Sequence, residues 1–204
     1  MDYIISSGIG YLLGSISPSY IISRIKKTDI RKTGTKNLGA SNTFMHFGRF
    51  WGVIVMLFDF LKAYFAVKLC KYLFASTISG VFAGACAIVG HNYPFYLKFK
   101  GGKGLAALGG FVLAVNPVHF LILLPACLSV ALILNYACFL PLTATVILPF
   151  VYGYYFKSLA VFGLIAAVCA GMFFKFLDNV KKINRGEEPK LRDFIKKYIF
   201  KTDH

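Results

Sequence analysis

Acidic residues are scarce in this sequence. Its 204 residues include eight Asp and Glu against 23 Lys and Arg, which gives a formal net charge of +15. Charged residues of both signs make up only 15% of the chain, whereas hydrophobic residues make up 57%. Soluble globular proteins have about 25% charged and about 45–50% apolar residues, so the composition excludes an ordinary water-soluble domain. Nucleic-acid binding would explain the charge but not the hydrophobicity, and we expect no nucleic-acid partner.

Signals for export and for metal binding are also missing. The first residues, Met-Asp-Tyr-Ile, place no basic segment before the first apolar run, and no small-residue cleavage site follows, so we expect no cleaved signal peptide. The cysteines show neither metal-ligand spacing nor a disulfide pattern. They lie within or beside apolar runs, at Cys70, Cys86, Cys127, Cys138 and Cys169. The sequence therefore predicts no metal and no other cofactor.

Long apolar runs dominate the rest of the chain. A hydrocarbon core of about 30 Å is crossed by about 20 apolar helical residues, and these runs lack the apolar and polar alternation of a barrel wall. We expect an all-α, polytopic membrane protein with seven transmembrane helices, six being the fallback, in a single domain over residues 1–204. The expected spans are 3–22, 51–69, 73–90, 104–115, 118–135, 139–156 and 158–177.

The positive charge predicts the orientation, because short loops rich in Lys and Arg stay in the cytoplasm. Three segments, 23–50, 91–103 and 175–204, hold 19 of the 23 Lys and Arg. With seven spans they share one side, which places the N-terminus outside and the C-terminus in the cytoplasm. Six spans would place the two largest basic clusters on opposite sides of the membrane.

The C-terminal tail alternates apolar and basic residues after Pro189. The spacing predicts a basic amphipathic helix lying on the anionic inner leaflet. Its apolar residues are Leu191, Phe194, Ile195 and Tyr198, and its basic residues are Lys190, Arg192, Lys196 and Lys197.

Two predicted cytoplasmic loops have compositions that suit phosphate. Residues 34–43 (GTKNLGASNT) combine glycines with hydroxyl and amide side chains, as in a polyoxygen-anion site, although ordinary polar turns look similar. Residues 99–104 (FKGGKG) lead directly into an apolar span, where glycine N–H groups and the helix dipole favour phosphate. This is not a Walker A loop, because Leu97 and Gly104 stand where that motif has Gly and Ser or Thr.

Two short patterns fall inside expected spans. Asp59 and Lys62 are spaced for a local ion pair with a structural role. Gly10 and Gly14 form a small-xxx-small pair that is typical of a helix-packing face. The turn 135–138 and the segment 179–182 are expected on the same membrane face as the two glycine-containing loops.

Together these stretches resemble the bacterial integral-membrane acyl-phosphate:glycerol-3-phosphate acyltransferases. The likeness is carried by Gly14-Ser15-Ile16 with 34–42, by Asp59-Phe60-Leu61-Lys62, by 90–91 with 99–104, and by Asn179-Val180 with 186–190. The resemblance implies seven helices, an active site at the cytoplasmic face of a bacterial cell membrane, and a multi-pass topology.

The resemblance also implies a reaction and its residues. The family transfers a fatty acyl group from a long-chain acyl-phosphate to glycerol 3-phosphate, giving lysophosphatidate and phosphate, beside membrane lipid and without a metal. Lys103 and Asn179 would be catalytic, and His91, Asp59 and Lys62 would support the site. The residues that would bind substrate phosphate are Thr35, Lys36, Asn37, Ser41, Lys100, Gly101, Gly102, Gly104 and Cys138.

The sequence departs from the family pattern at five positions. Thr35 and Cys138 stand in place of Ser, Lys36 in place of Gly, Met45 in place of Arg and Phe176 in place of His. Losing an arginine removes a bidentate phosphate donor, and Lys36 supplies a compensating charge nearby. The alternative is a divergent, non-catalytic paralogue that binds phosphorylated lipid precursors or regulates phospholipid synthesis. A small-solute transporter is disfavoured, because it would have polar groups at the bilayer midplane.

Overall fold

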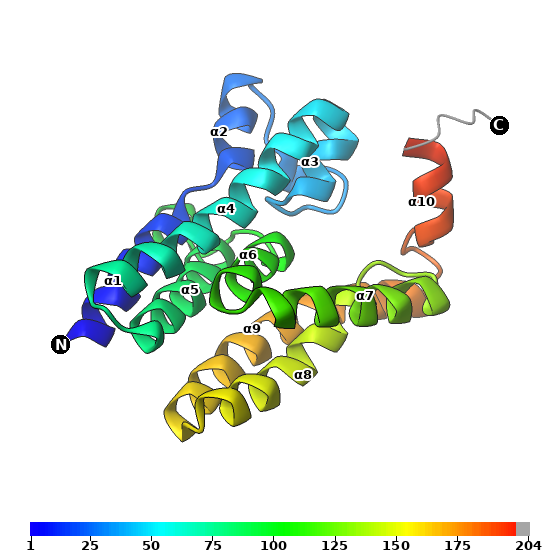
Figure 1. Ribbon diagram of the computed structural model, residues 1–204. Helices are drawn as coiled ribbons and strands as arrows, with labels where there is room; N and C mark the ends of the chain where they lie inside the picture. Colours follow the sequence, from blue (N-terminus) through cyan, green and yellow to red (C-terminus); the bar gives the residue numbers. More distant parts are fainter. Residues whose placement is uncertain (199–204) are drawn as a thin grey trace. The chain divides into compact units, whose positions relative to one another are not determined.

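The computed structural model describes residues 1–198, and every regular element in that range is helical (Figure 1). The chain forms two compact units, the first spanning Met1–Phe120 and the second beginning at Leu121. In chain order the elements are α1 (Asp2–Ser15), α2 (Pro18–Ile25), η1 (Ile30–Lys32), α3 (Ala40–Phe47), α4 (Arg49–Leu73), α5 (Thr77–Asn92), η2 (Phe95–Leu97), α6 (Leu105–Val115), α7 (Pro117–Leu134), α8 (Phe139–Phe156), α9 (Leu159–Asn184) and α10 (Leu191–Tyr198).

The first unit is built on close packing between α1 and α5, which lie side by side in Figure 1. A Cβ added at Gly10 would collide with the carbonyl of Ala83, and one at Gly14 would collide with the carbonyl of Ala87. The absence of side chains lets the two backbones approach, as small residues do in membrane helices. The helix-packing role predicted for Gly10 and Gly14 is confirmed.

The first apolar run is not one continuous helix, so the expected span 3–22 is wrong as a single element. Helix α1 ends at Ser15, and α2 begins at Pro18. Pro18 disfavours helical backbone at the residue before it, and the Ser17 hydroxyl accepts the Tyr20 N–H to cap the new helix. The break leaves the Ile16 carbonyl available to a side chain of another helix.

Three helices of the described chain, α7, α8 and α9, are long and apolar enough to cross a membrane. Helix α6, with 11 residues, is about 16 Å long, short of the roughly 30 Å hydrocarbon core. Seven spans and their orientation therefore remain predictions.

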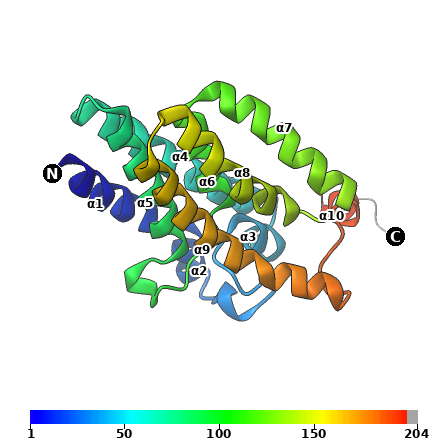
Figure 2. The ribbon, with the colours of Figure 1, turned by 90° about the horizontal axis from the view of Figure 1, so that it is seen from below.

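The second unit contains α8 packed along α9, as Figures 1 and 2 both show. Helix α10 begins where the N–H groups of Leu191 and Arg192 donate to the backbone and side-chain oxygens of Asn135 at 2.8 and 3.0 Å. Its Leu191, Phe194 and Ile195 are half-buried, and its Arg192 is exposed, as an amphipathic helix requires. The side chains of Lys197 and Tyr198 lie outside the described set.

Candidate functional site

The two glycine-containing loops of the first unit are brought together by a small apolar cluster. Ile30 and Leu38 from the first loop and Leu97 from the second are all at most 3% exposed and contact one another, with Tyr20 and Phe47 packed against them. Burying these side chains stabilises the loop pair, because each apolar side chain removed from water contributes about 1.5–3 kcal/mol. The cluster fixes the spacing of the polar residues around it.

Two residues of this cluster, Leu38 and Leu97, also line a cavity of about 450 Å³. Its walls carry four cationic side chains, and no carboxylate is among the lining residues. The lining residues are Arg31, Lys36, Lys98, Lys100, Leu38, Leu97 and Gly101. Arg31 is ion-paired with Asp29, which lies outside this lining, so the wall keeps an excess of positive charge. Such an excess attracts an anion and raises its local concentration. Three predicted phosphate-binding residues, Lys36, Lys100 and Gly101, therefore line one cavity.

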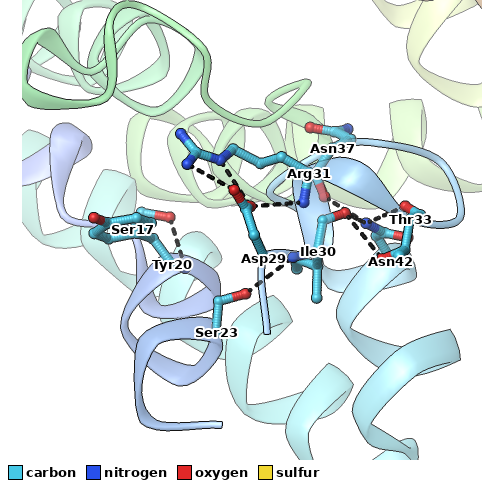
Figure 3. A network of polar contacts seen from close by, with 9 residues as sticks. All are labelled: Ser17, Tyr20, Ser23, Asp29, Ile30, Arg31, Thr33, Asn37 and Asn42. Atoms are coloured by element: carbon cyan, nitrogen blue, oxygen red, sulfur yellow. Dashed lines mark hydrogen bonds and ion pairs between the residues drawn. The ribbon is translucent and has the colours of Figure 1, made fainter. Parts of the chain in front are cut away.

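The first loop is held in shape by Asn42, which is 1% exposed at the start of α3. Its side-chain oxygen accepts the N–H of Thr35 at 3.0 Å. Its amide nitrogen donates to the carbonyls of Ile30, Thr33 and Asn37 at 2.7, 3.3 and 3.0 Å (Figure 3). Asn37, expected to bind substrate, therefore already contributes its carbonyl to the loop. Ser41, also in this segment, is exposed.

Lys36 adopts a backbone conformation that favours glycine. Its φ is +56°, in the left-handed region, and its N–H donates to the Thr33 carbonyl at 2.9 Å. Left-handed backbone costs a side-chain-bearing residue roughly 1–2 kcal/mol, and such strain persists only where the surroundings enforce it. Asn42 provides that enforcement. The chain thus carries a cation on the cavity wall at a conformational cost.

Arg31 is a cavity residue that the sequence reasoning did not select. Its Nε donates to Asp29 Oδ1 and its Nη2 to Oδ2, both at 2.9 Å, and its guanidinium lies 5.7 Å from the centre of the Tyr20 ring (Figure 3). The hydrogen bonds from Arg31 hold the pKa of Asp29 below its usual value. Arg31 also lines a second cavity of about 420 Å³, together with Tyr20, Ser23, Arg24, Lys27, Thr28 and Asp29. An Asp-x-Arg step before a glycine-containing loop was the available signal.

The FKGGKG loop uses its glycines differently from the sequence-based expectation. The N–H groups of Gly101 and Gly102 donate to the carbonyls of Asn92 and His91 at 3.2 and 3.0 Å, so the expectation that these N–H groups are free for phosphate is wrong. A Cβ at Gly101 would collide with the His91 carbonyl, and one at Gly102 with the His91 ring. Their small size lets the loop close against the end of α5.

Lys103 lies at the end of this loop and is half-buried. The next residue, Gly104, has φ +86° and precedes the first turn of α6. A Cβ at Gly104 would lie 2.8 Å from Asn92 Oδ1, and the left-handed backbone there favours glycine. Gly104 therefore fixes how the chain leaves Lys103 and enters the helix.

A buried ionic cluster supports the same loop from below. Lys62 Nζ lies 2.7 Å from Asp59 Oδ1 and 2.9 Å from His91 Nδ1, and it donates to the Ile16 carbonyl at 2.8 Å. His91 Nδ1 is 3.2 Å from the same Asp59 oxygen. The ion pair predicted for Asp59 and Lys62 is confirmed. It ties α4 to the break after α1 and to the α5 end that carries the glycine loop.

The remaining predicted residues belong to the second unit. Asn179, on α9, donates from Nδ2 to Glu188 Oε1 at 2.6 Å, so its amide is oriented by the segment that follows the helix. Cys138 precedes α8 and is 3% exposed. All five cysteines are free thiols. Within residues 1–198, no three His, Cys, Asp or Glu side chains gather to hold a metal ion.

Of the five departures from the family pattern, Lys36 and Cys138 are described above. Thr35 is fixed by its own N–H to Asn42, as described above. Met45 lies on α3, is half-buried and lines neither cavity. Phe176 lies on α9 and is 7% exposed. Arg31, rather than position 45, provides a guanidinium at the cation-lined cavity.

Comparison with known proteins gives one consistent result. The sequence model of the family described as "Glycerol-3-phosphate acyltransferase" matches residues 4–186. The chain is 35% identical to the glycerol-3-phosphate acyltransferase of Thermosipho melanesiensis, over 93% of each chain. It is 32% identical to that of Thermoanaerobacter pseudethanolicus, over 94% of this chain and 96% of the relative.

Two solved structures give the same result at the level of fold. Both are of PlsY, an integral membrane glycerol 3-phosphate acyltransferase, at 30% identity to this chain. The glycerol 3-phosphate form has a TM-score of 0.81, with 93% of this chain and 96% of the other covered. The lysophosphatidic acid form has a TM-score of 0.77, with 93% and 95% covered.

Proposed function

The chain belongs to the glycerol-3-phosphate acyltransferase family, and from that premise we propose that it transfers a fatty acyl group from a long-chain acyl-phosphate to glycerol 3-phosphate. The products are lysophosphatidate and inorganic phosphate. The observation that carries the proposal is the cavity lined by four cations and no carboxylate. Both substrates carry phosphate, and a wall of this charge suits them.

The chemistry asks mainly for positioning. A hydroxyl oxygen of glycerol 3-phosphate attacks the acyl carbonyl carbon, the bond from that carbon to the bridging oxygen breaks, and phosphate leaves with the bonding electrons. The hydroxyl proton passes to a phosphate oxygen of the substrates. Because acyl-phosphate is already activated, orientation and neutralisation of phosphate charge supply most of the catalysis. No nucleophilic side chain is needed.

Each group of residues has a role in this proposal. Lys103 neutralises phosphate charge at the start of α6, and Lys36 and Lys100 do so at the cavity. Thr35, Asn37, Ser41 and the glycines shape the pocket of the first unit. In the second unit, the proposed role of Asn179 is to position the glycerol substrate and that of Cys138 is to bind phosphate. The cluster of Asp59, Lys62 and His91 supports the glycine loop.

The proposal includes the setting of the protein. We infer a multi-pass protein of the bacterial cytoplasmic membrane, with seven spans, the N-terminus outside and a single functional domain over residues 1–204. The basic loops then face the cytoplasm, where a water-soluble glycerol 3-phosphate and a membrane-associated acyl chain meet. Helix α10 lies on the anionic inner leaflet.

The test is a reconstituted assay with purified protein, glycerol 3-phosphate and a long-chain acyl-phosphate, following both lysophosphatidate and released phosphate. Lys103→Ala should abolish product while the protein still inserts and keeps its helical content. Lys32→Ala is the matched control, because Lys32 is an exposed cation that lies outside the FKGGKG loop and was not predicted to bind substrate. Turnover by Lys103→Ala equal to that of the unchanged protein would refute the role of Lys103.

The second candidate, a non-catalytic paralogue, is motivated by Met45 and Phe176. It predicts no turnover by folded protein that still binds either substrate. On that account, restoring Met45→Arg together with Phe176→His should create activity. An active unchanged protein would exclude this candidate.

A further inference from the structure

Arg31 lines both of the cavities described above. It is the one arginine among the residues that line the 450 Å³ cavity, where the other cations are lysines. Lysine presents a compact point charge, whereas a guanidinium presents a planar fork that matches two phosphate oxygens. Among the cavity residues, Arg31 alone therefore has the geometry for two-point recognition of phosphate.

The orientation of this guanidinium is fixed by contacts on the side of Asp29. Nε and Nη2 each donate to a different carboxylate oxygen at 2.9 Å. The backbone N–H of Arg31 also donates to Asp29 Oδ1, at 3.1 Å. The Tyr20 ring lies 5.7 Å from the guanidinium carbon. These contacts restrict the rotation of a side chain that is otherwise long and flexible.

The ion pair with Asp29 leaves some N–H donors of the Arg31 guanidinium available to a ligand. A guanidinium has five N–H donors, and the Asp29 carboxylate takes two of them. The donors of Nη1 and the second N–H of Nη2 form another edge of the same plane. The Arg31 side chain is 34% exposed, so an incoming anion has access to it.

We propose that Arg31 binds the phosphate group of a substrate in the 450 Å³ cavity through a two-point contact, and that Asp29 is the positioning residue that aims it. The assignment of this phosphate to a substrate rests on the proposed function. The contact itself does not, because inorganic phosphate carries the same oxygen pair. Lys36 and Lys100 add positive charge to the same site, and Arg31 fixes the orientation of the bound phosphate.

The competing explanation is that Arg31 contributes only its charge to the cavity and that Asp29 does not orient it. The two accounts predict opposite changes in phosphate affinity for Asp29→Asn. Removing the carboxylate makes the cavity more positive, so charge alone predicts tighter phosphate binding. If Asp29 orients the Arg31 guanidinium, its loss predicts weaker phosphate binding in spite of that added charge. Arg31→Lys keeps the charge and removes the fork, which should weaken binding by about tenfold, the loss of one charge-assisted hydrogen bond.

The experiment measures inorganic phosphate binding by titration calorimetry on the full chain in lipid nanodiscs, with the KM for glycerol 3-phosphate as a parallel readout. Weaker binding in both Arg31→Lys and Asp29→Asn supports the proposal. Unchanged binding in Arg31→Lys overturns the role of Arg31, and tighter binding in Asp29→Asn overturns the role of Asp29. Lys27→Gln is the matched control, because Lys27 lines only the second cavity. A loss in Lys27→Gln as large as that in Arg31→Lys would place the anion in the second cavity and overturn the proposal.

A second measurement needs no variant and so does not depend on a variant folding. Phenylglyoxal modifies accessible arginines, and mass spectrometry reports the modification of the peptide that contains Arg31. Phosphate should slow the modification of Arg31 but not that of the exposed Arg185. Equal rates with and without phosphate would overturn the proposal. If phosphate binding depends on Arg31 but the protein forms no lysophosphatidate, then the proposed function fails and the site stands.

Discussion

Replacing Lys36 with glycine is expected to move stability and substrate affinity in opposite directions. The backbone of Lys36 has φ +56°, where a Cβ is unfavourable and glycine is not. The same side chain lines the cation-rich cavity. Lys36→Gly therefore removes a strain and a functional charge in one change, and the two effects can be measured separately.

The magnitudes follow from these two features. Relief of left-handed strain is worth roughly 1–2 kcal/mol, and the greater freedom of glycine in the unfolded chain takes back about 0.4–1 kcal/mol. The net gain is about 0.5–1 kcal/mol, or a rise of about 2 °C in melting temperature for a chain of this size. Lys36 is exposed, so its attraction to a phosphate about 4 Å away is about 1 kcal/mol in a water-like dielectric. That energy corresponds to a rise of about fivefold in the KM for glycerol 3-phosphate.

The assay pairs thermal unfolding in detergent with initial rates at varied glycerol 3-phosphate. Lys36→Ala is the matched control, because it loses the charge but keeps a Cβ at the same backbone position. Lys36→Ala should raise the KM for glycerol 3-phosphate as much as Lys36→Gly does. It should melt at a lower temperature than Lys36→Gly. The difference in KM between the unchanged protein and either variant should shrink at about 1 M salt, where the screening length is about 3 Å. A Lys36→Gly protein that is less stable than Lys36→Ala, or that keeps its KM, would refute the reasoning.

Three further changes test other parts of the account. Gly14→Leu should lower the melting temperature by overpacking α1 against α5, at a cost of about 1–3 kcal/mol or more, whereas Gly8→Leu should not, because a Cβ at Gly8 meets no atom within 4 Å. Lys62→Met should cost about 3–5 kcal/mol in chemical unfolding by leaving Asp59 buried without its ammonium partner, and the double variant with Asp59→Leu should recover much of that loss. Asn42→Ala should speed hydrogen exchange of the first-loop amides and weaken phosphate binding, since it removes four hydrogen bonds to the loop. Unchanged exchange would contradict the conclusion that Asn42 holds this loop in shape.

Local sequence signals predicted much of the fold. The expected span 139–156 coincides with α8, and the break between 104–115 and 118–135 falls at Asn116, where α6 ends and α7 begins. Hydropathy and proline act over a few residues, so they can be read directly from the sequence. The continuous first span was wrong, although Pro18 carried the signal for the break.

The site was harder to predict, because its geometry depends on contacts between distant residues. The cavity exists because Ile30 and Leu38 pack on Leu97, a contact across about 60 positions that no local pattern encodes. Arg31 was missed although the Asp-x-Arg step offered a local signal, because its place on the cavity wall depends on the same distant contact. The N–H groups of Gly101 and Gly102 were expected to be free because a free glycine N–H and one bonded to a nearby helix end look alike in a sequence.

The central claim is acyl transfer from acyl-phosphate, and the most direct measurement is the stoichiometry of the two products. Purified protein with glycerol 3-phosphate and a long-chain acyl-phosphate should release one phosphate for each lysophosphatidate formed, and both should vanish in Lys103→Ala. Phosphate release without lysophosphatidate, or no product from folded protein that binds both substrates, would contradict the account.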